Sequence, residues 1–251
     1  MIQVIAHRGY SGRAPENTLA ALRRGIEAGA DAVEWDMHVA ACGTPVLLHD
    51  ETLQRTTNGS GAVREWTFDR LRQLDAGAWF APEFAGEPVP SFVEALEEIR
   101  PSGAWVYPEL KGYGKPEDLD RMVGSVSELG MQGRTVFISL DYDAADDIAA
   151  RDRELRVGYV VDRLRRFPDA LRRASLLGPR GMVDLDYRFV LVNPALVGQA
   201  RSRGVDVAVW TVDAVGDAEA LVRAGVRRLT TNQVGRLTRW RDARADSLLE
   251  A

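Results

Sequence analysis

The sequence predicts an α/β protein, specifically a TIM (β/α)8 barrel with a small insertion after its second strand. Three observations in the 251 residues support this prediction. Short apolar runs alternate with helical patterns, polar residues gather where several runs end, and one long segment interrupts the alternation. Such alternation is typical of a parallel sheet with crossover helices, and roughly 250 residues is the usual size for eight strand–helix units.

The first half of the chain is predicted to alternate between strands and helices. The helix after the first strand repeats apolar residues at helical spacing, and Asn17 is predicted as its N-cap. Ser91 and Glu94 have the spacing of a capping box, which marks the start of another helix. The predicted elements, in chain order, are strand Gln3–His7, helix Asn17–Ala28, extended segments Ala32–Val39 and Pro45–Leu48, helix Ser91–Ile99, strand Ala104–Leu110 and helix Glu117–Leu129.

The second half continues the same alternation. A doubly wound open sheet is the alternative arrangement of such elements, but no Gly-rich dinucleotide motif follows the first strand, which disfavours it. The predicted strands are Thr135–Leu140, Arg156–Val161, Gly181–Leu185, Val205–Val212 and Val226–Thr231. The predicted helices are Ala144–Arg151, Pro168–Ser175, Pro194–Arg203, Asp217–Ala224 and the tail from Leu237.

Residues 51–90 interrupt the alternation of predicted strands and helices. Turn-forming residues dominate this segment, for example at Thr56–Gly61 and Glu83–Pro88, and Phe68–Leu74 is its only helical stretch. A loop of this length inside a compact domain is usually functional or forms a small subdomain. We therefore expect a single domain over residues 1–251, with an insertion at about 51–90 that caps one end of the barrel.

Composition excludes several classes of function. The net charge of −5 indicates no nucleic-acid partner, since a nucleic-acid-binding surface is normally basic. No apolar run approaches the roughly 20 residues that cross a bilayer, so no stable membrane anchor is expected. The N-terminus has no signal-peptide pattern, which makes the cytoplasm the simplest location. The single cysteine, Cys42, excludes an intrachain disulfide.

Three carboxylates suggest a metal site. Glu34 and Asp36 are two residues apart on a predicted strand, so their side chains point to the same face. Their like charges repel unless a cation lies between them, and Glu109 on the next barrel strand could supply a third oxygen. Carboxylate-only ligation favours a divalent cation such as Mg²⁺ or Ca²⁺ over Zn²⁺. The alternative, a surface charge pair on an edge strand, fits a buried parallel sheet less well.

Two histidines and two cations surround these carboxylates in the predicted barrel. His7 and His49 each end a predicted strand, and the carboxyl ends of barrel strands build the active-site face. Imidazoles titrate near neutrality, so the pair suits general acid–base catalysis. Arg8 and Lys111 suit an anion such as phosphate, the first as a bidentate fork and the second as a point charge.

Three other polar or aromatic residues near these strands have less specific interpretations. His38 continues the alternation of Glu34 and Asp36, but its position further along favours a residue at the rim over a fourth ligand. Trp210 alternates with valines and faces either the barrel mouth or a helix. Glu16 either orients a neighbouring cation or has only a structural role.

Taken in order, these motifs resemble the glycerophosphodiester phosphodiesterases over nearly the whole chain. Any one motif is weak, but their ordered series is specific. It comprises His7-Arg8-Gly9, Pro15–Thr18, Glu34-Trp35-Asp36, His49-Asp50, Leu53–Thr57, Gly59, Gly86–Pro90 leading into Phe92–Leu96, Pro108–Lys111, Ser139–Asp141 and Val209–Val212. The sequence departs from the family pattern at Ala40–Thr44, in a loop, and at Asn232, where the family usually has Asp.

The resemblance implies a role for each candidate residue. Glu34, Asp36 and Glu109 would hold the divalent cation, His7 and His49 would be the acid–base pair, and Arg8 and Lys111 would hold the phosphate. Trp210 would lie near the glycerol of the substrate. His49 is our choice for the general acid. The Asn232 substitution removes a charge near the barrel mouth, which bears on substrate preference and not on the core chemistry.

The implied activity is hydrolysis of small-molecule glycerophosphodiesters, such as glycerophosphocholine or glycerophosphoethanolamine, to sn-glycerol 3-phosphate and an alcohol. The nucleophile is either water or the glycerol 2-hydroxyl. One alternative is a lysophospholipase D or sphingomyelinase D-like phosphodiesterase on the same barrel, and another is a non-catalytic module that binds polyol phosphates. A lipid substrate needs an apolar surface, but Trp66, Trp79, Phe80 and Phe84 of the insertion are predicted to form its own small core.

Overall fold

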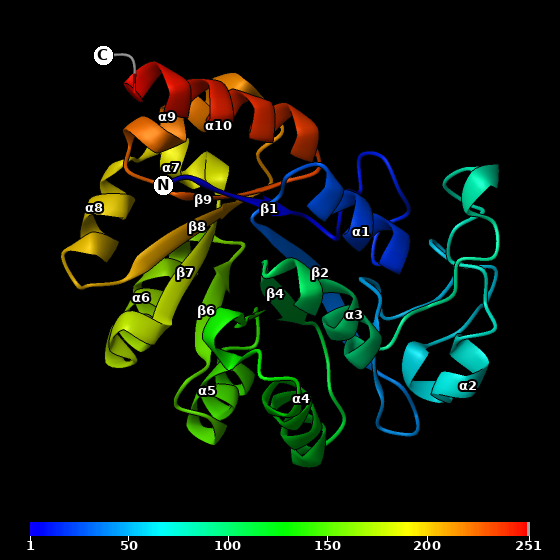
Figure 1. The fold of residues 1–251 in the computed structure, drawn as a ribbon. Coiled ribbons are helices and arrows are strands. Elements are labelled where there is room, and N and C mark those ends of the chain that lie inside the picture. Colours follow the sequence, from blue (N-terminus) through cyan, green and yellow to red (C-terminus); the bar gives the residue numbers. More distant parts are fainter. Residues whose placement is uncertain (250–251) are drawn as a thin grey trace.

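The strands form a closed barrel. The computed structural model describes residues 1–249, with side chains described to residue 244. One sheet of nine strands has the order β1-β9-β8-β7-β6-β5-β4-β2-β3, and the additional pairing of β1 with β2 closes the ring (Figure 1). All strands except β3 pair in parallel, which leaves eight barrel strands and confirms the predicted TIM barrel.

The elements follow the predicted order with small shifts at their ends. The strands are β1 (Gln3–Ala6), β2 (Ala32–Val39), β3 (Pro45–Leu47), β4 (Trp105–Leu110), β5 (Val136–Ser139), β6 (Arg156–Val161), β7 (Gly181–Asp186), β8 (Asp206–Trp210) and β9 (Arg228–Thr231). The α-helices are α1 (Leu19–Glu27), α2 (Phe68–Leu71), α3 (Phe92–Ile99), α4 (Pro116–Glu128), α5 (Tyr142–Arg151), α6 (Phe167–Leu176), α7 (Tyr187–Val192), α8 (Ala195–Arg201), α9 (Val215–Arg223) and α10 (Val234–Leu249). Single-turn 3₁₀ helices lie at Val63–Glu65, Pro82–Phe84, Arg100–Ser102, Gln132–Arg134, Leu164–Arg166 and Gly178–Arg180.

The first helix begins later than predicted, and Asn17 is not its N-cap. Thr18 caps α1, because its hydroxyl accepts a hydrogen bond from the Ala21 amide. Asn17 adopts a left-handed backbone conformation (φ 59°), and its side chain turns to Asp36 on β2. Both residue types cap helices well, and the hydrogen bonds to a buried carboxylate decide between them. The sequence prediction also missed α7 entirely and began α10 three residues late.

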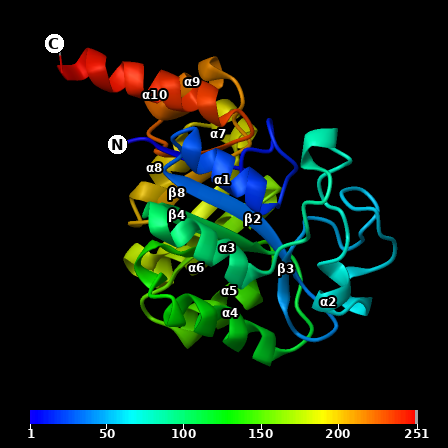
Figure 2. The same cartoon turned by 45° about the vertical axis from the view of Figure 1, so that its right-hand side comes forward.

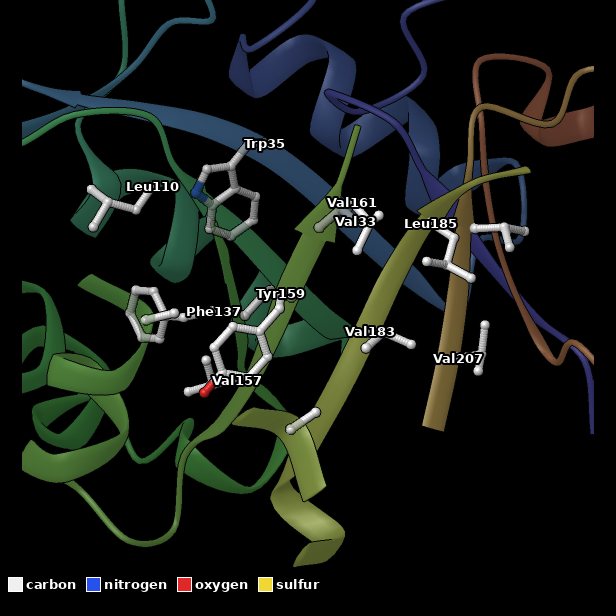
Figure 3. Packing of buried hydrophobic residues seen from close by; sticks show 14 of the residues in the cluster. Val33, Trp35, Leu110, Phe137, Val157, Tyr159, Val161, Val183, Leu185 and Val207 are labelled. Atoms are coloured by element: carbon white, nitrogen blue, oxygen red, sulfur yellow. The ribbon is translucent and has the colours of Figure 1, made fainter. Parts of the chain in front are cut away.

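Side chains alternate across each barrel strand. On β2, Val33, Trp35 and Met37 point outward and join the main core between the barrel and its helices, part of which Figure 3 shows. A second, smaller apolar cluster, which includes Ile5 and Tyr107, fills the inside of the barrel. Since both faces of the strands are covered, a charged side chain on the inner face has to find a partner or a ligand there.

The insertion lies to one side of the barrel, beyond the end of β2 and its antiparallel partner β3 (Figure 2). Its aromatic residues do not form a single core of their own, contrary to the prediction. Trp66 packs within the insertion, but Phe80 and Phe84 pack on Ala20 and Ala21 of helix α1. A segment of this size buries too little apolar surface by itself and gains it by packing against the barrel.

Candidate active site

A cavity of about 420 Å³ opens at the carboxyl ends of the barrel strands. One wall, from β1, β2, β4 and the loop after β3, is charged. This charged wall comprises His7, Arg8, Glu34, His49, Glu109 and Lys111. The opposite wall, from β5 to β9, is mostly apolar. This apolar wall comprises Ile138, Leu140, Val160, Trp210, Thr211 and Thr230, with Asp184 as its one carboxyl group. Asp36, next to the charged wall, is the one predicted site residue that does not line the cavity.

The three predicted carboxylates converge next to this cavity. Asp36 and Glu109 are register neighbours on β2 and β4, and Glu34 lies two residues before Asp36 on the same face. One oxygen from each of the three carboxylates lies within 4.8 Å of the others. Glu34 Oε1 and Asp36 Oδ1 are buried without a hydrogen-bond partner among the described residues. A carboxylate-only cluster with buried, unpartnered oxygens fits a hard divalent cation.

The three carboxylates of the cluster differ in how their surroundings affect ionisation. Burial, together with the charges of Asp36 and Glu109, raises the pKa of Glu34 well above its usual value. Burial and the charge of Asp36 raise the pKa of Glu109 to about 7. Burial also opposes ionisation of Asp36, but the charges of Arg8 and Lys111 outweigh it and lower its pKa. Only Asp36 therefore has enough neighbouring positive charge to stay ionised without a cation.

Arg8 and Lys111 lie against the carboxylates. The Arg8 amide donates to Glu34 at 2.7 Å, and its guanidinium forms ion pairs with Asp36 at 3.0 Å and Glu16 at 2.8 Å. The Lys111 ammonium donates to Glu109 at 3.1 Å and lies 3.6 Å from Asp36. Burial alone would lower the pKa of Lys111, but Glu109 and Asp36 outweigh it and raise that pKa, so the ammonium stays charged. Both cations therefore face the cavity beside the cluster.

The hydrogen bonds of His7 define its tautomer. Asn232 donates through Nδ2 to the Asp213 carboxylate at 2.9 Å, which leaves its Oδ1 to face His7 Nδ1 at 2.7 Å. Since that oxygen can only accept, His7 Nδ1 carries the proton. His7 Nε2 is then the free acceptor and lies 4.0 Å from Glu34 Oε2. Burial and the charge of Arg8 lower the pKa of His7 to about 4, so the ring is neutral at pH 7.

His49 has a different environment from His7. Its Nδ1 lies 2.7 Å from Asp50 Oδ1, and its side chain is 31% exposed. Arg55 donates to both Asp50 and Glu16, which joins the insertion to the loop that precedes helix α1. The hydrogen bond from Arg55 lowers the pKa of Asp50, which therefore stays ionised beside the ring. The two histidines therefore differ in their partners, an amide for His7 and a carboxylate for His49.

His38 lies outside this cavity. Its Nε2 is 3.0 Å from the main-chain carbonyl of His49, and its ring lines a larger cavity of about 720 Å³ between the insertion and helix α4. None of the three clustered carboxylates lines that larger cavity, although it has the greater volume. We therefore assign the chemistry to the smaller cavity and leave His38 at its rim.

The sequence did not predict the roles that three residues of the site have in the structure. Asn17 donates to the Asp36 carboxylate at 2.9 Å and accepts from the Asp36 amide at 3.0 Å, so it orients that carboxylate. Asn232 orients His7, and Asp184 lies on the inner face of β7. In the sequence, Asp184 is recognisable only as a carboxylate within a predicted strand that is otherwise apolar. Trp210 faces the cavity, and its indole Nε1 donates to the Asp184 carbonyl at 3.3 Å.

Similarity to known proteins covers nearly the whole chain. The model of the glycerophosphoryl diester phosphodiesterase family matches residues 7–236. A glycerophosphodiester phosphodiesterase from Caldanaerobacter subterraneus subsp. tengcongensis is 34% identical over 234 residues, which cover 91% of this chain and 93% of that protein. A solved phosphodiesterase from Oleispira antarctica, in complex with the product sn-glycerol-3-phosphate, is 29% identical with a TM-score of 0.80, and the match covers 96% of each chain. A glycerophosphodiester phosphodiesterase from Agrobacterium tumefaciens is also 29% identical, with a TM-score of 0.78 over 94% of this chain and 98% of that one.

Proposed function

Because the chain belongs to the glycerophosphoryl diester phosphodiesterase family, we propose that it hydrolyses glycerophosphodiesters to sn-glycerol 3-phosphate and an alcohol. The observation that carries this proposal is the meeting of three carboxylates, two cations and two imidazoles around one cavity. This set supplies what phosphodiester hydrolysis needs, namely charge stabilisation at the phosphoryl group, a base and an acid. Small glycerophosphodiesters are the proposed substrates.

A divalent cation, Mg²⁺ or Ca²⁺, is proposed as the cofactor. Glu34, Asp36 and Glu109 would hold it, and their unpartnered buried oxygens and raised pKa values support this assignment. When bound, such a cation supplies Lewis-acid polarisation of a phosphoryl oxygen. Asn17 keeps the Asp36 carboxylate oriented through two hydrogen bonds, so the ligand set is arranged before the substrate arrives.

Arg8 and Lys111 would bind the phosphate of the substrate. Both side chains line the cavity and are only 18% and 17% exposed, so their charges act in a partly desolvated environment. Each is already paired with a carboxylate of the cluster. Neutralisation of that cluster by a cation would weaken these pairs and make both side chains available to phosphate oxygens.

His7 is proposed as the general base and His49 as the general acid. The hydrogen bond between His7 Nδ1 and Asn232 leaves Nε2 unprotonated, so His7 can accept the proton of the attacking hydroxyl, from water or from the glycerol itself. The Asp50 carboxylate holds His49 through Nδ1, which orients the ring toward the departing alkoxide that it would protonate. The different partners of the two rings therefore match opposite steps of one reaction.

The test of this function is a substrate panel assayed with the full chain and Mg²⁺ or Ca²⁺. Glycerophosphocholine, lysophosphatidylcholine and sphingomyelin are incubated separately, and the phosphorus products are identified by ³¹P NMR. We expect sn-glycerol 3-phosphate from glycerophosphocholine at the highest kcat/KM of the three. Cleavage of a lipid in preference to glycerophosphocholine would instead assign the chain to lysophospholipase D or sphingomyelinase D-like chemistry. Binding of glycerophosphocholine without turnover would identify a binding module.

A further inference from the structure

Asp184 is a buried carboxyl group that none of the proposed steps uses. It lies on the inner face of β7, between Val160 of β6 and Ala208 of β8 in the sheet register, and only 3% of it is exposed. Its Oδ1 is buried without a hydrogen-bond partner among the described residues. Burial, and next the charge of Glu109, raise its pKa well above the usual value. A buried carboxyl group without a partner costs stability, which is typical of a functional role.

The surroundings of Asp184 suit a small polyol. Val160, Ile138 and Leu140 give this wall apolar surface that can pack on carbon atoms, and the Trp210 ring adds a flat aromatic face. Asp184, Thr211 and Thr230 are polar side chains on the same wall. A carboxyl oxygen can accept a hydrogen bond from a hydroxyl, and Oδ1 of Asp184 has no other partner among the described residues. An apolar pocket with few polar groups is the usual form of a specific small-ligand site.

The position of Asp184 determines which half of the substrate it can meet. The phosphate-binding cations and the carboxylate cluster lie on the charged wall, so the two ester arms of a bound diester extend from there. One arm, the alcohol, differs between substrates and needs space toward solvent. The other arm, glycerol, is constant and small, and Asp184, which is almost fully buried, can meet only a group that enters the cavity.

We propose that Asp184 recognises a hydroxyl of the substrate's glycerol and so sets the preference for glycerol diesters over diesters of simpler alcohols. This inference rests on the proposed function. Because the carboxyl group is already buried and unpartnered, a substrate that lacks the matching hydroxyl leaves it unsatisfied in the complex. Sites of this kind discriminate strongly against analogues without the hydrogen-bonding group.

The experiment compares kcat/KM for glycerophosphocholine with kcat/KM for two analogues. The first, 3-hydroxypropyl phosphocholine, lacks the 2-hydroxyl. The second, 2-hydroxyethyl phosphocholine, lacks the terminal hydroxymethyl group. The wild-type chain should favour glycerophosphocholine over at least one of them by roughly 10- to 100-fold. In Asp184→Leu the preference over 2-hydroxyethyl phosphocholine, which keeps the hydroxyl that could act as the nucleophile, should fall to near one. Asp184→Asn should retain part of that preference. Choline release measures all three substrates in the same assay.

Asp118→Asn is the matched control, because Asp118 is another buried acid with an unpartnered oxygen, and it lies outside this cavity. Its substrate ratios should equal those of the wild type. If Asp184→Leu does not fold, as judged by circular dichroism, Asp184→Ala makes the same comparison. Unchanged ratios in a folded Asp184 variant would overturn the inference while leaving the proposed function intact. If the wild type releases no sn-glycerol 3-phosphate, the proposed function fails first.

Discussion

The two walls of the active-site cavity contrast in composition and in how completely their polar groups are paired. On the charged wall nearly every side chain has a partner of opposite charge, and the exceptions are single oxygens of the carboxylate cluster. On the apolar wall, the carboxyl group of Asp184 has no ion-pair partner among the described residues, and its Oδ1 has no hydrogen-bond partner there either. The contrast suggests that the two walls have different roles. The charged wall would carry out the phosphoryl chemistry, and the apolar wall would recognise the glycerol of the substrate.

The largest effect is expected at the acid–base pair. His49→Ala should lower kcat by about 10²- to 10⁴-fold, because the departing alkoxide loses its proton donor. Steady-state kinetics on glycerophosphocholine measure the loss, and circular dichroism checks the fold. His38→Gln is the matched control, since His38 lines the neighbouring cavity instead, and it should stay within about tenfold of the wild type. Near-normal turnover by His49→Ala would contradict the proposed mechanism.

The next largest effect concerns the residue that orients Asp36. Asn17→Ala removes both hydrogen bonds to Asp36 and should weaken cation affinity by roughly 10- to 100-fold, the usual cost of losing an outer-shell partner. Calorimetric titration with Mg²⁺ or Ca²⁺ measures it. Asn17→Gly separates the hydrogen bonds from backbone strain, since glycine accepts the left-handed conformation of this position. Only if both variants lose affinity alike does orientation of Asp36 explain the effect.

The carboxylate cluster should make cation affinity depend on pH. Because the pKa of Glu109 is raised to about 7, the cation-free protein holds a proton on this group below pH 7 and must release it to bind the cation. Affinity should therefore fall about tenfold for each pH unit below 7 per proton released, and Glu34, whose pKa is also raised, should add to this dependence. Titrations in buffers of different ionisation enthalpy measure the released protons. Affinity that is independent of pH between 5 and 7 would disprove the raised pKa.

The smallest effect is expected at Trp210, on the apolar wall. Trp210→Phe keeps an aromatic face but loses the hydrogen bond from the indole to the Asp184 carbonyl. That hydrogen bond lies within the protein, where it is worth about 1 kcal/mol, so its loss acts only through the position of the ring and should raise KM by at most roughly fivefold with kcat nearly unchanged. Steady-state kinetics on glycerophosphocholine separate the two parameters. A fall in kcat comparable to that of His49→Ala would mean that the apolar wall also takes part in the chemical step.

The sequence predicted the barrel and the meeting of its site residues because both depend on repeated patterns. Strand–helix alternation indicates the parallel sheet, and the two-residue spacing of Glu34 and Asp36 puts both on one face. Partnerships between distant segments have no such pattern. Arg55 reaches Glu16 across 39 residues, and Asn232 reaches His7 across 225. The role of Asn17 was misjudged because a good N-cap residue and a buried hydrogen-bond partner look alike in the sequence.

The burial of isolated polar residues was the other feature that the sequence could not supply. Asp184 stands in a strand of alternating residues, and its carboxyl group alone does not reveal whether it faces solvent, a helix or the cavity. The structure turns it toward the cavity, opposite the charged wall. The insertion shows the same limit, since its aromatic residues were recognisable as core residues but their packing partners on helix α1 were not.

The most direct test of the central claim is a titration of the cation-free enzyme with Mg²⁺ or Ca²⁺ while release of sn-glycerol 3-phosphate from glycerophosphocholine is followed. Turnover should be lost after EDTA treatment and should return in a saturable manner with the added cation. The Asp36→Asn variant should need a much higher cation concentration to respond. Full turnover of the EDTA-treated enzyme without any added cation would contradict the account.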